Sequence, residues 1–333
     1  MSTSPGSRNR APGDWRPTAT IDLLRFRARL LAQLRGFFDE AGVLEVETPA
    51  LSPAAVTDVH LESLRVSRPD GPELGWLHTS PEFAMKRLLA GGAGDCWQLC
   101  RVFRGAEQGR RHNPEFSLLE WYRVGWSLSA LMDEVAALLR VLARDRLSLK
   151  PPVSLTYLEA MTTTAGVDPF SDAPEALVAA LSDHGVAVPP GLADDRDACL
   201  DLLLSGVVEP ALDPERPTFI HDFPASQAAL ARIRPGEPPV AERFELFLGG
   251  MELANGFAEL TDAREQRVRF ARDLETRRKY GLPAPPVDHR FLAALEAGLP
   301  DCAGVALGFD RLVMVLAGAD SIDQVLAFPW GRA

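Results

Sequence analysis

FRGAEQGRRHNPEFSLLEWY, the segment from Phe103 to Tyr122, determines more about the fold than any other part of the chain. It interleaves arginines, a histidine, an asparagine and three carboxylates with apolar residues, a pattern that predicts a strand–loop–strand hairpin. Arginine side chains that point into one cleft can hold phosphate groups through planar, charge-assisted hydrogen bonds. The alternative for a run of this composition is a charged hairpin tip in solvent.

Further segments favour the cleft. They are RGFFDEAGVLEVETPAL (Arg35–Leu51), ERFELFLGGMELANGFAELTDAREQ (Glu242–Gln266) and GVALGFDRLVM (Gly304–Met314). Together with the first segment they resemble the catalytic core of class II lysyl-tRNA synthetases, and most closely the shortened branch that attaches lysine to elongation factor P. The resemblance runs from about Ile21 to the C-terminus. It implies an α+β fold in which an antiparallel β-sheet is flanked by helices, with the active site on the sheet face.

Composition and length set the domain plan. The chain has 333 residues, 46% of them hydrophobic and 24% charged, as in a globular protein with a sizeable core. We expect residues 1–19 to form a flexible N-terminal tail rather than a secretory signal, because they contain no apolar segment. Residues 20–333 would form the catalytic domain. Only about twenty residues precede the first helix, too few for a five-stranded barrel, so no anticodon-binding domain is expected.

The same properties limit partners and location. A formal net charge of −11 argues against a large nucleic-acid surface. No apolar run approaches the roughly 18 residues that a membrane span requires. We therefore expect a cytoplasmic protein with no membrane partner, and tRNA is an unlikely ligand.

Local patterns place the motifs on elements. An amphipathic helix is predicted from Ile21 to Phe38, followed by a strand that Pro49 ends. The resemblance implies that this region forms a homodimer interface. Pro69-Asp70-Gly71 predicts a hairpin turn, and Ser80-Pro81 predicts the start of a helix. Residues from about 127 to 217 alternate Leu- and Ala-rich helical patterns with breaks, which predicts a helical insertion between the catalytic motifs.

A second hairpin is predicted around Gly249-Gly250, because two glycines between alternating apolar runs favour a tight turn. This turn places Phe247 opposite Glu252, and it places Glu245 on the same face, diagonal to Glu252. Two such carboxylates can share a Mg²⁺ ion with nucleotide phosphates. The alternative is a pair of glutamates that face solvent.

The spacing of two glutamates predicts an irregularity in the strand that follows this turn. Glu252 and Glu259 are an odd number of residues apart, so a regular strand would point them to opposite faces. We expect Asn255-Gly256 to form a bulge or turn that brings both carboxylates to one pocket.

The resemblance implies adenylate chemistry with ATP and Mg²⁺. Arg104 would hold the α-phosphate and the substrate carboxylate, Arg311 would hold the γ-phosphate end, and these two arginines are the catalytic residues. Glu245 and Glu252 would hold the metal, and Phe116 would stack on adenine. The full set of expected ATP-binding residues is Arg104, Glu107, His112, Asn113, Phe116, Glu252, Leu253, Gly308 and Arg311.

The resemblance also implies a lysine pocket. Glu259, helped by the hydroxyl of Tyr122, would bind the substrate ε-ammonium, and Glu82 would bind the other ammonium group. Ala306 stands where tRNA-charging enzymes tend to have glycine, and the branch that shares this alanine favours β-lysine over α-lysine. The expected substrate-binding residues are Ser80, Pro81, Glu82, Tyr122, Asn255, Glu259 and Ala306.

One motif departs from the family. The family usually has Arg-Asn-Glu where this chain has Arg104-Gly105-Ala106, so the expected glutamate is absent. Glu107, one position further on, could replace it through a shifted loop, although a shift of one residue along a strand reverses the direction of the side chain.

Three functions remain open from the sequence. The first is an ATP-dependent ligase that activates lysine, especially (R)-β-lysine, and transfers it to a lysine of elongation factor P. The second is a truncated synthetase that charges tRNA or another acceptor. The third is a non-catalytic binding protein that has kept the fold, which the altered Gly105-Ala106 motif favours.

Overall fold

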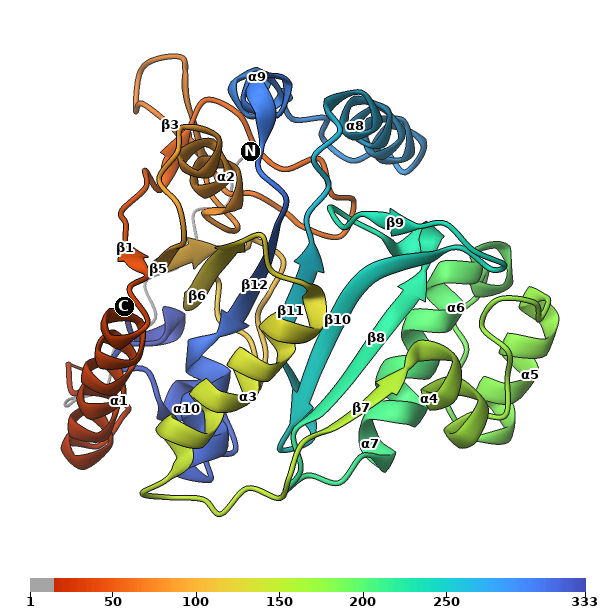
Figure 1. Cartoon of the computed structure of the whole chain (residues 1–333), viewed down its shortest axis with the longest axis horizontal. Coiled ribbons are helices and arrows are strands. Elements are labelled where there is room, and N and C mark those ends of the chain that lie inside the picture. Colours follow the sequence, from red (N-terminus) through yellow and green to blue (C-terminus); the bar gives the residue numbers. More distant parts are fainter. Residues whose placement is uncertain (1–14) are drawn as a thin grey trace, which may run out of the picture.

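A computed structural model describes residues 15–333 and is built around one large sheet (Figure 1). In spatial order its strands are β1 (Leu44–Glu45), β5 (Cys96–Phe103), β6 (Glu115–Val124), β12 (Cys302–Gly308), β11 (Met251–Ala258), β10 (Val240–Leu248), β8 (Thr218–Pro224) and β7 (Val153–Thr156), and β9 (Ile233–Arg234) pairs with β10. Neighbouring strands are antiparallel except for β1 with β5 and β7 with β8. The predicted α+β fold with a mainly antiparallel sheet is confirmed.

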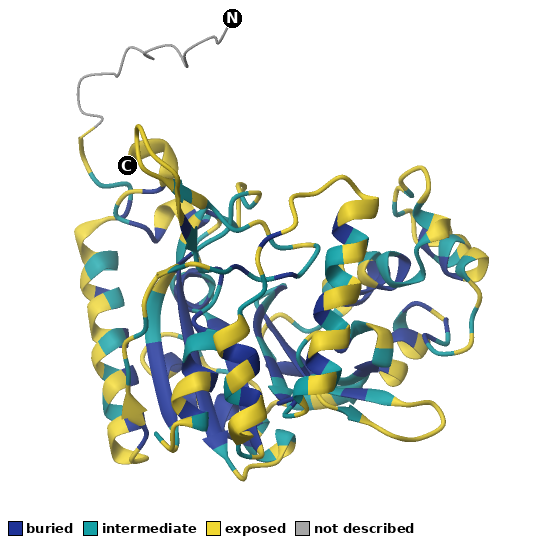
Figure 2. Cartoon of the chain, turned by 90° about the horizontal axis from the view of Figure 1, so that it is seen from above, coloured by how far each residue is buried: buried dark blue, intermediate teal, exposed yellow. Residues whose placement is uncertain are grey.

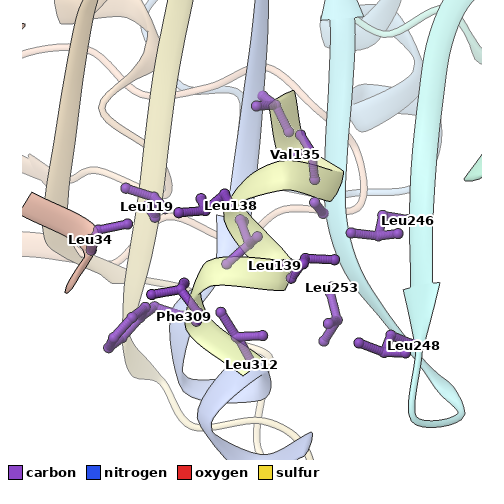
Figure 3. Packing of buried hydrophobic residues seen from close by; sticks show 14 of the residues in the cluster. Leu34, Leu119, Val135, Leu138, Leu139, Leu246, Leu248, Leu253, Phe309 and Leu312 are labelled. Atoms are coloured by element: carbon purple, nitrogen blue, oxygen red, sulfur yellow. The ribbon is translucent and has the colours of Figure 1, made fainter. Parts of the chain in front are cut away.

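Helices α1 (Ile21–Glu40), α3 (Leu128–Ala143) and α10 (Phe309–Ala317) cover one face of this sheet. The side chain of Thr20 caps α1, and the helix buries residues spaced by four, from Phe26 to Phe38. Leucines of α3 pack between α10 and the middle strands, as Figure 3 shows for Leu138 and Leu139. This core packs against one face of the central strands and leaves the other face to other segments of the chain.

Helices α2 (Glu82–Ala90), α8 (Ala263–Lys279) and α9 (His289–Gly298) form a second group above one end of the sheet (Figure 1). Phe83 stacks on Phe291 with ring centroids 4.5 Å apart, and Phe270 lies against both rings. A small sheet of β2 (Leu51–Ser52), β4 (Glu73–Leu77) and β3 (Arg65–Ser67) contains the predicted hairpin turn.

The segment from about 127 to 217 is helical only in part. Helices α4 (Tyr157–Thr164), α5 (Pro174–Asp183) and α6 (Arg196–Leu203) pack on one another and on β8 and β10 in a core of their own. The short helix α7 (Glu209–Ala211) follows them and buries no residue. Helix α3 instead belongs to the main core, and β7 extends the main sheet. The helices that stand apart therefore begin at α4, because the apolar face of α3 is buried against the central strands.

Short helical turns complete the chain. Single 3₁₀ turns lie at Leu192–Asp194, Ala225–Gln227, Ile322–Gln324 and Trp330–Arg332, and a π turn covers Leu204–Val208. Figure 2 shows that the buried residues concentrate in the sheet strands and on the inner faces of the helices. Among the helices of residues 15–333, none combines the length and the apolar composition needed to cross a membrane.

The predicted N-terminal tail is too long by at least two residues. Residues 1–14 lie outside the described part of the chain. Thr18 and Ala19, however, donate backbone hydrogen bonds to Ala327 and Leu326 at 2.9 and 3.2 Å, and Ala19 is buried. These residues are fixed against the C-terminal segment because their backbone groups find partners there.

Candidate active site

A cavity of about 1080 Å³ opens on the sheet face opposite α3, and Asp310 and Arg311 in the first turn of α10 also line it. Strand β6 shows the division: Leu119 and Trp121 enter the core with α3, whereas Phe116 and Leu118 line the cavity. The cavity is lined by these residues of the predicted site: Ser80, Glu82, Arg104, Glu107, His112, Asn113, Phe116, Glu245, Glu252, Leu253, Asn255, Ala306, Gly308 and Arg311. Pro81, Tyr122 and Glu259 are not among the lining residues.

The hairpin that carries the two glutamates forms at the predicted turn. Gly249 and Gly250 have φ angles of 64° and 70°, a conformation that favours glycine. Phe247 pairs with Glu252, as the turn required. Glu245 and Glu252 therefore reach the same cavity from neighbouring strands.

The bulge predicted at Asn255-Gly256 lies at Leu253 instead. The pairing of β11 with β10 passes from Glu252 directly to Ala254, so Leu253 is the extra residue. Asn255 and Gly256 pair regularly with both neighbouring strands. Because Leu253 and Ala254 both enter the apolar core, the alternation of side chains reverses there, and Glu252 and Glu259 come to the same side of the strand.

Glu245 is a buried carboxyl that already has one cationic partner, Arg243. Burial raises its pKa to about 8, although the neighbouring Arg243, with which it forms an ion pair, acts in the opposite direction. Within residues 15–333 no group of three or more metal-ligating side chains forms, so Glu245 and Glu252 could bind Mg²⁺ only together with oxygen atoms of a nucleotide. Arg243 donates to Glu245 Oε1, so Glu245 Oε2 and the Glu252 carboxylate are the oxygens that such a shared site would use.

Two arginines line the cavity, Arg104 after β5 and Arg311 in the first turn of α10. Arg311 Nη2 lies 2.6 Å from His112 Nε2, and Arg311 Nη1 donates to the Glu252 carbonyl oxygen at 3.1 Å. Burial and the charge of Arg311 lower the pKa of His112, so its Nε2 accepts this hydrogen bond. Arg104 lies over the Phe116 ring at 5.0 Å, and its buried Nε has no hydrogen-bond partner among the described residues. An anionic ligand could supply that partner.

The altered motif beside Arg104 has a structural explanation. Gly105 donates its backbone N–H to the Glu62 carbonyl oxygen at 2.8 Å, and an added Cβ would lie 3.1–3.2 Å from the side chains of Glu62 and Leu64. Glu107 Oε1 accepts a hydrogen bond from Arg104 Nη1 at 3.1 Å and lines the cavity. The loop therefore presents a carboxylate to Arg104 one position later than the family pattern does.

Asn113 is held by the protein itself. Its side-chain Nδ2 donates to the Glu115 carbonyl oxygen at 2.6 Å, and its Oδ1 accepts from the backbone N–H of Trp330 at 2.9 Å. The side chain ties the arginine-rich hairpin to the C-terminal segment. A contact of Asn113 with a nucleotide therefore stays a prediction.

Tyr122 and Glu259 meet above Gly304. A Cβ added to this glycine would lie 2.3 Å from a Tyr122 ring carbon and 2.5 Å from Glu259 Oε1. Both residues are almost fully buried, with 2% and 1% exposure. The Tyr122 hydroxyl donates to Glu120 Oε1 at 2.6 Å rather than to Glu259. The ring and the carboxylate nevertheless form one wall behind the cavity.

Sequence reasoning missed Glu120. This buried carboxylate accepts hydrogen bonds from the hydroxyls of Tyr122 and Ser80. It is paired with Ala306 on the neighbouring strand β12. Burial and the nearby Glu82 raise its pKa to about 8. The signal was present in the alternation of the strand, because Glu120 lies two residues before Tyr122 and so shares its face.

Sequence reasoning also missed Lys86. Its ammonium lies 2.5 Å from Glu82 Oε1 and 2.5 Å from Glu259 Oε2. The position one helical turn after Glu82 indicates the first contact, because residues four apart are neighbours on a helix. The contact with Glu259 depends on the tertiary fold.

The chain is similar to known proteins along nearly its whole length. The family model described as tRNA synthetases class II (D, K and N) matches residues 10–332. The chain is 49% identical over 324 residues to the elongation factor P (R)-β-lysine ligase of Vibrio cholerae, which covers 96% of this chain and 99% of that protein. It is 49% identical over 323 residues to the protein of the same name from Klebsiella pneumoniae, covering 96% of this chain and 98% of that protein. The Haemophilus ducreyi protein of that name is 48% identical over 324 residues, covering 96% and 97%.

Proposed function

The chain belongs to the class II tRNA synthetases of the D, K and N group, and from this premise we propose that it is an elongation factor P (R)-β-lysine ligase. It activates (R)-β-lysine with ATP and transfers the activated acid to a lysine side chain of elongation factor P. The observation that carries the proposal is that one cavity brings together arginines suited to phosphate and carboxylates suited to ammonium groups. Arg104, Arg311 and Glu82 line it, and Glu120 lies next to the lining residue Ser80, whose hydroxyl donates to it.

The first half-reaction forms an aminoacyl-adenylate. An oxygen of the substrate carboxylate attacks the α-phosphorus of ATP, the bond to the bridging oxygen breaks, and pyrophosphate leaves. We propose that Arg104 neutralises charge at the α-phosphate and that Arg311 does so at the γ-phosphate end. Phe116, already beneath the Arg104 guanidinium, would stack on adenine. A Mg²⁺ ion held by Glu245 and Glu252 would neutralise phosphate charge.

The second half-reaction forms an amide. The uncharged amino group of the acceptor lysine attacks the carbonyl carbon of the adenylate, loses a proton, and AMP leaves. The protein contributes mainly by holding the two reactants in contact. We propose that Glu259 and Tyr122 lie at the far end of the substrate, and that Glu82 and Glu120 bind the amino group nearer the carboxylate.

Ala306 is positioned to affect which isomer is accepted. It pairs with Glu120 on one side and with Asn255 on the other, in the middle of the substrate-facing strands. Its methyl group therefore takes space beside the carboxylate that would bind the nearer amino group. Ala306→Gly should shift the preference from β-lysine towards α-lysine, because a small change of volume in a tight pocket alters packing.

ATP–pyrophosphate exchange with a panel of α- and β-amino acids tests the activation step. We expect exchange with (R)-β-lysine, weaker exchange with α-lysine, and none with norleucine, which lacks the terminal ammonium. Incubation with elongation factor P should then add the mass of one lysyl residue to the acceptor, and should do so only when ATP is present.

The two alternatives give different results. A tRNA-charging enzyme would bind tRNA with an affinity that falls steeply with salt, because phosphate contacts release counterions. A non-catalytic relative would bind ATP or lysine without any exchange. Either result would refute the proposed ligase.

We further propose that residues 20–333 act as one catalytic domain in the cytoplasm, and that the protein forms a homodimer through the region from Ile21 to Pro49. Strand β1 lies at the edge of the sheet there, and Leu44 on it is 52% exposed. An exposed apolar residue on an edge strand is suited to a partner surface, and two-fold dimers are the commonest oligomers.

A further inference from the structure

Lys86 is a fully buried cation behind the amino-acid pocket. It is 1% exposed, and its ammonium contacts one carboxylate from its own helix, Glu82, and one from the end of β11, Glu259. The ring of Phe291 on α9 lies 5.9 Å from the ammonium. Burial by itself lowers the pKa of Lys86, but Glu259 and Glu82 outweigh it and raise that pKa, so the side chain stays charged at neutral pH.

The contacts use only one oxygen of each carboxylate. Lys86 pairs with Oε1 of Glu82 and with Oε2 of Glu259. Within residues 15–333 the other oxygens, Oε2 of Glu82 and Oε1 of Glu259, accept no hydrogen bond from the protein. Glu82 lines the cavity, and Glu259 Oε1 lies beside the Tyr122 ring at Gly304. Lys86 thus pairs with one oxygen of each carboxylate, and it links Glu82, which lines the cavity, to Glu259 in the wall behind it.

The charges around the pocket then match the substrate. Glu82, Glu120 and Glu259 carry three negative charges when ionised, and Lys86 carries one positive charge. The two negative charges that remain equal the two ammonium groups of lysine or β-lysine, while the substrate carboxylate faces Arg104. We propose that Lys86 is a positioning residue that sets this charge and so selects acids with two ammonium groups, an inference that rests on the proposed function.

Removing the ammonium should change the protonation of Glu259. Burial raises the pKa of Glu259 to about 7, and Lys86 is the charge that opposes this rise. The other polar groups that face the cluster are Glu82, Glu120, the Tyr122 hydroxyl and the Cys302 thiol, none of which can replace a cation. Without Lys86, Glu259 should remain protonated at neutral pH and should lose its attraction for a substrate ammonium.

Lys86→Met tests this with a matched control. The control is Lys150→Met, because Lys150 also contacts two carboxylates, Asp213 at 3.0 Å and Glu215 at 2.9 Å, but lies exposed and away from the cavity. At pH 7.5 the KM for lysine in pyrophosphate exchange should rise about tenfold for each unit by which the Glu259 pKa exceeds the assay pH. The KM for ATP should change less than about twofold, and the rise in the KM for lysine should diminish as pH increases.

Thermal unfolding supplies a readout that does not depend on activity. In Lys86→Met the pKa of Glu259 in the folded protein is expected to lie well above its value in the unfolded chain. The folded protein therefore loses stability as pH rises towards that folded-state pKa, because Glu259 must then ionise without a counter-charge. The Tm deficit relative to the wild type should therefore be small near pH 6 and larger near pH 9, whereas Lys150→Met should show a small deficit at both. Lys86→Arg keeps the charge, so its pH dependence should follow the wild type even if its Tm is lower.

The outcomes separate this inference from the proposed function. If wild-type protein shows no exchange with any diamino acid, the ligase assignment fails, whereas the Tm comparison still tests the charge role of Lys86. A pH-independent Tm deficit in Lys86→Met would overturn the inference. So would a lower KM for lysine in that variant, because it would mean that Lys86 competes with the substrate for Glu259.

Discussion

Gly304→Ala should disable the amino-acid pocket while leaving the nucleotide site intact. Gly304 lies on β12 directly opposite Tyr122 on β6. An added Cβ would lie 2.3 and 2.4 Å from two ring carbons of Tyr122 and 2.5 Å from Glu259 Oε1. Because carbon atoms in contact are about 3.5–4.0 Å apart, the ring would have to move by about 1 Å.

Neither neighbour can move easily. Tyr122 is 2% exposed, and its hydroxyl donates a hydrogen bond to Glu120. Glu259 is 1% exposed and forms an ion pair with Lys86. Overpacking of this kind costs about 1–3 kcal/mol of unfolding free energy. A misplacement of about 1 Å at a reacting site can reduce the rate by about 10². We therefore expect kcat/KM for lysine to fall by about two orders of magnitude.

Pyrophosphate exchange and chemical denaturation would measure the two effects. The KM for ATP should stay within about twofold of the wild type. Gly331→Ala is the control, because a Cβ there meets no atom within 4 Å, and surface changes of this kind usually alter stability by less than about 0.5 kcal/mol. If Gly304→Ala retained the wild-type kcat/KM for lysine, the wall formed by Tyr122 and Glu259 would not belong to the substrate site.

Three further predictions concern the pH dependence of lysine binding, the role of Arg311 at the phosphates, and the dimer interface. Burial raises the pKa of Glu120 to about 8 and of Glu259 to about 7, and a substrate ammonium needs both ionised, so the KM for lysine in pyrophosphate exchange should fall as pH rises from 6 to 8. A flat KM over that range would contradict this. Arg311→Ala should lower the exchange rate by about 10²–10³ without changing the circular dichroism spectrum, and a rate close to wild type would refute its phosphate role. Sedimentation at micromolar concentration should show a dimer that Leu44→Glu dissociates, whereas a wild-type monomer would exclude the proposed interface.

The sequence alone determined the features that depend on neighbours in the chain. Gly249-Gly250 defined the hairpin because two positive φ angles are accessible to glycine, and the pairing of Phe247 with Glu252 followed from the turn. The order of the four motifs was sufficient to predict the class of fold. Most of the predicted site residues also line one cavity, and for those on strands, such as Phe116, Glu252 and Ala306, the facing direction follows from an alternation that is largely local.

Only the tertiary structure decided where that alternation changes. The sequence favoured Gly256 as part of a bulge. In the structure the absence of a side chain at this position makes room for the Phe244 ring, an atom of which would lie 2.4 Å from an added Cβ. The bulge falls at Leu253, where the successive apolar residues Leu253 and Ala254 both belong to the core. Packing across the sheet sets this choice, and the local sequence does not contain it.

The tertiary structure also decided the partners of the charged groups. Lys86 and Glu259 lie far apart in the chain, and Asn113 is satisfied by the backbone of Trp330 at the other end of the protein. A buried charge must find a counter-charge, and a buried amide must find hydrogen-bond partners. That requirement is general, but the residue that meets it is fixed only when the chain folds and brings distant segments into contact.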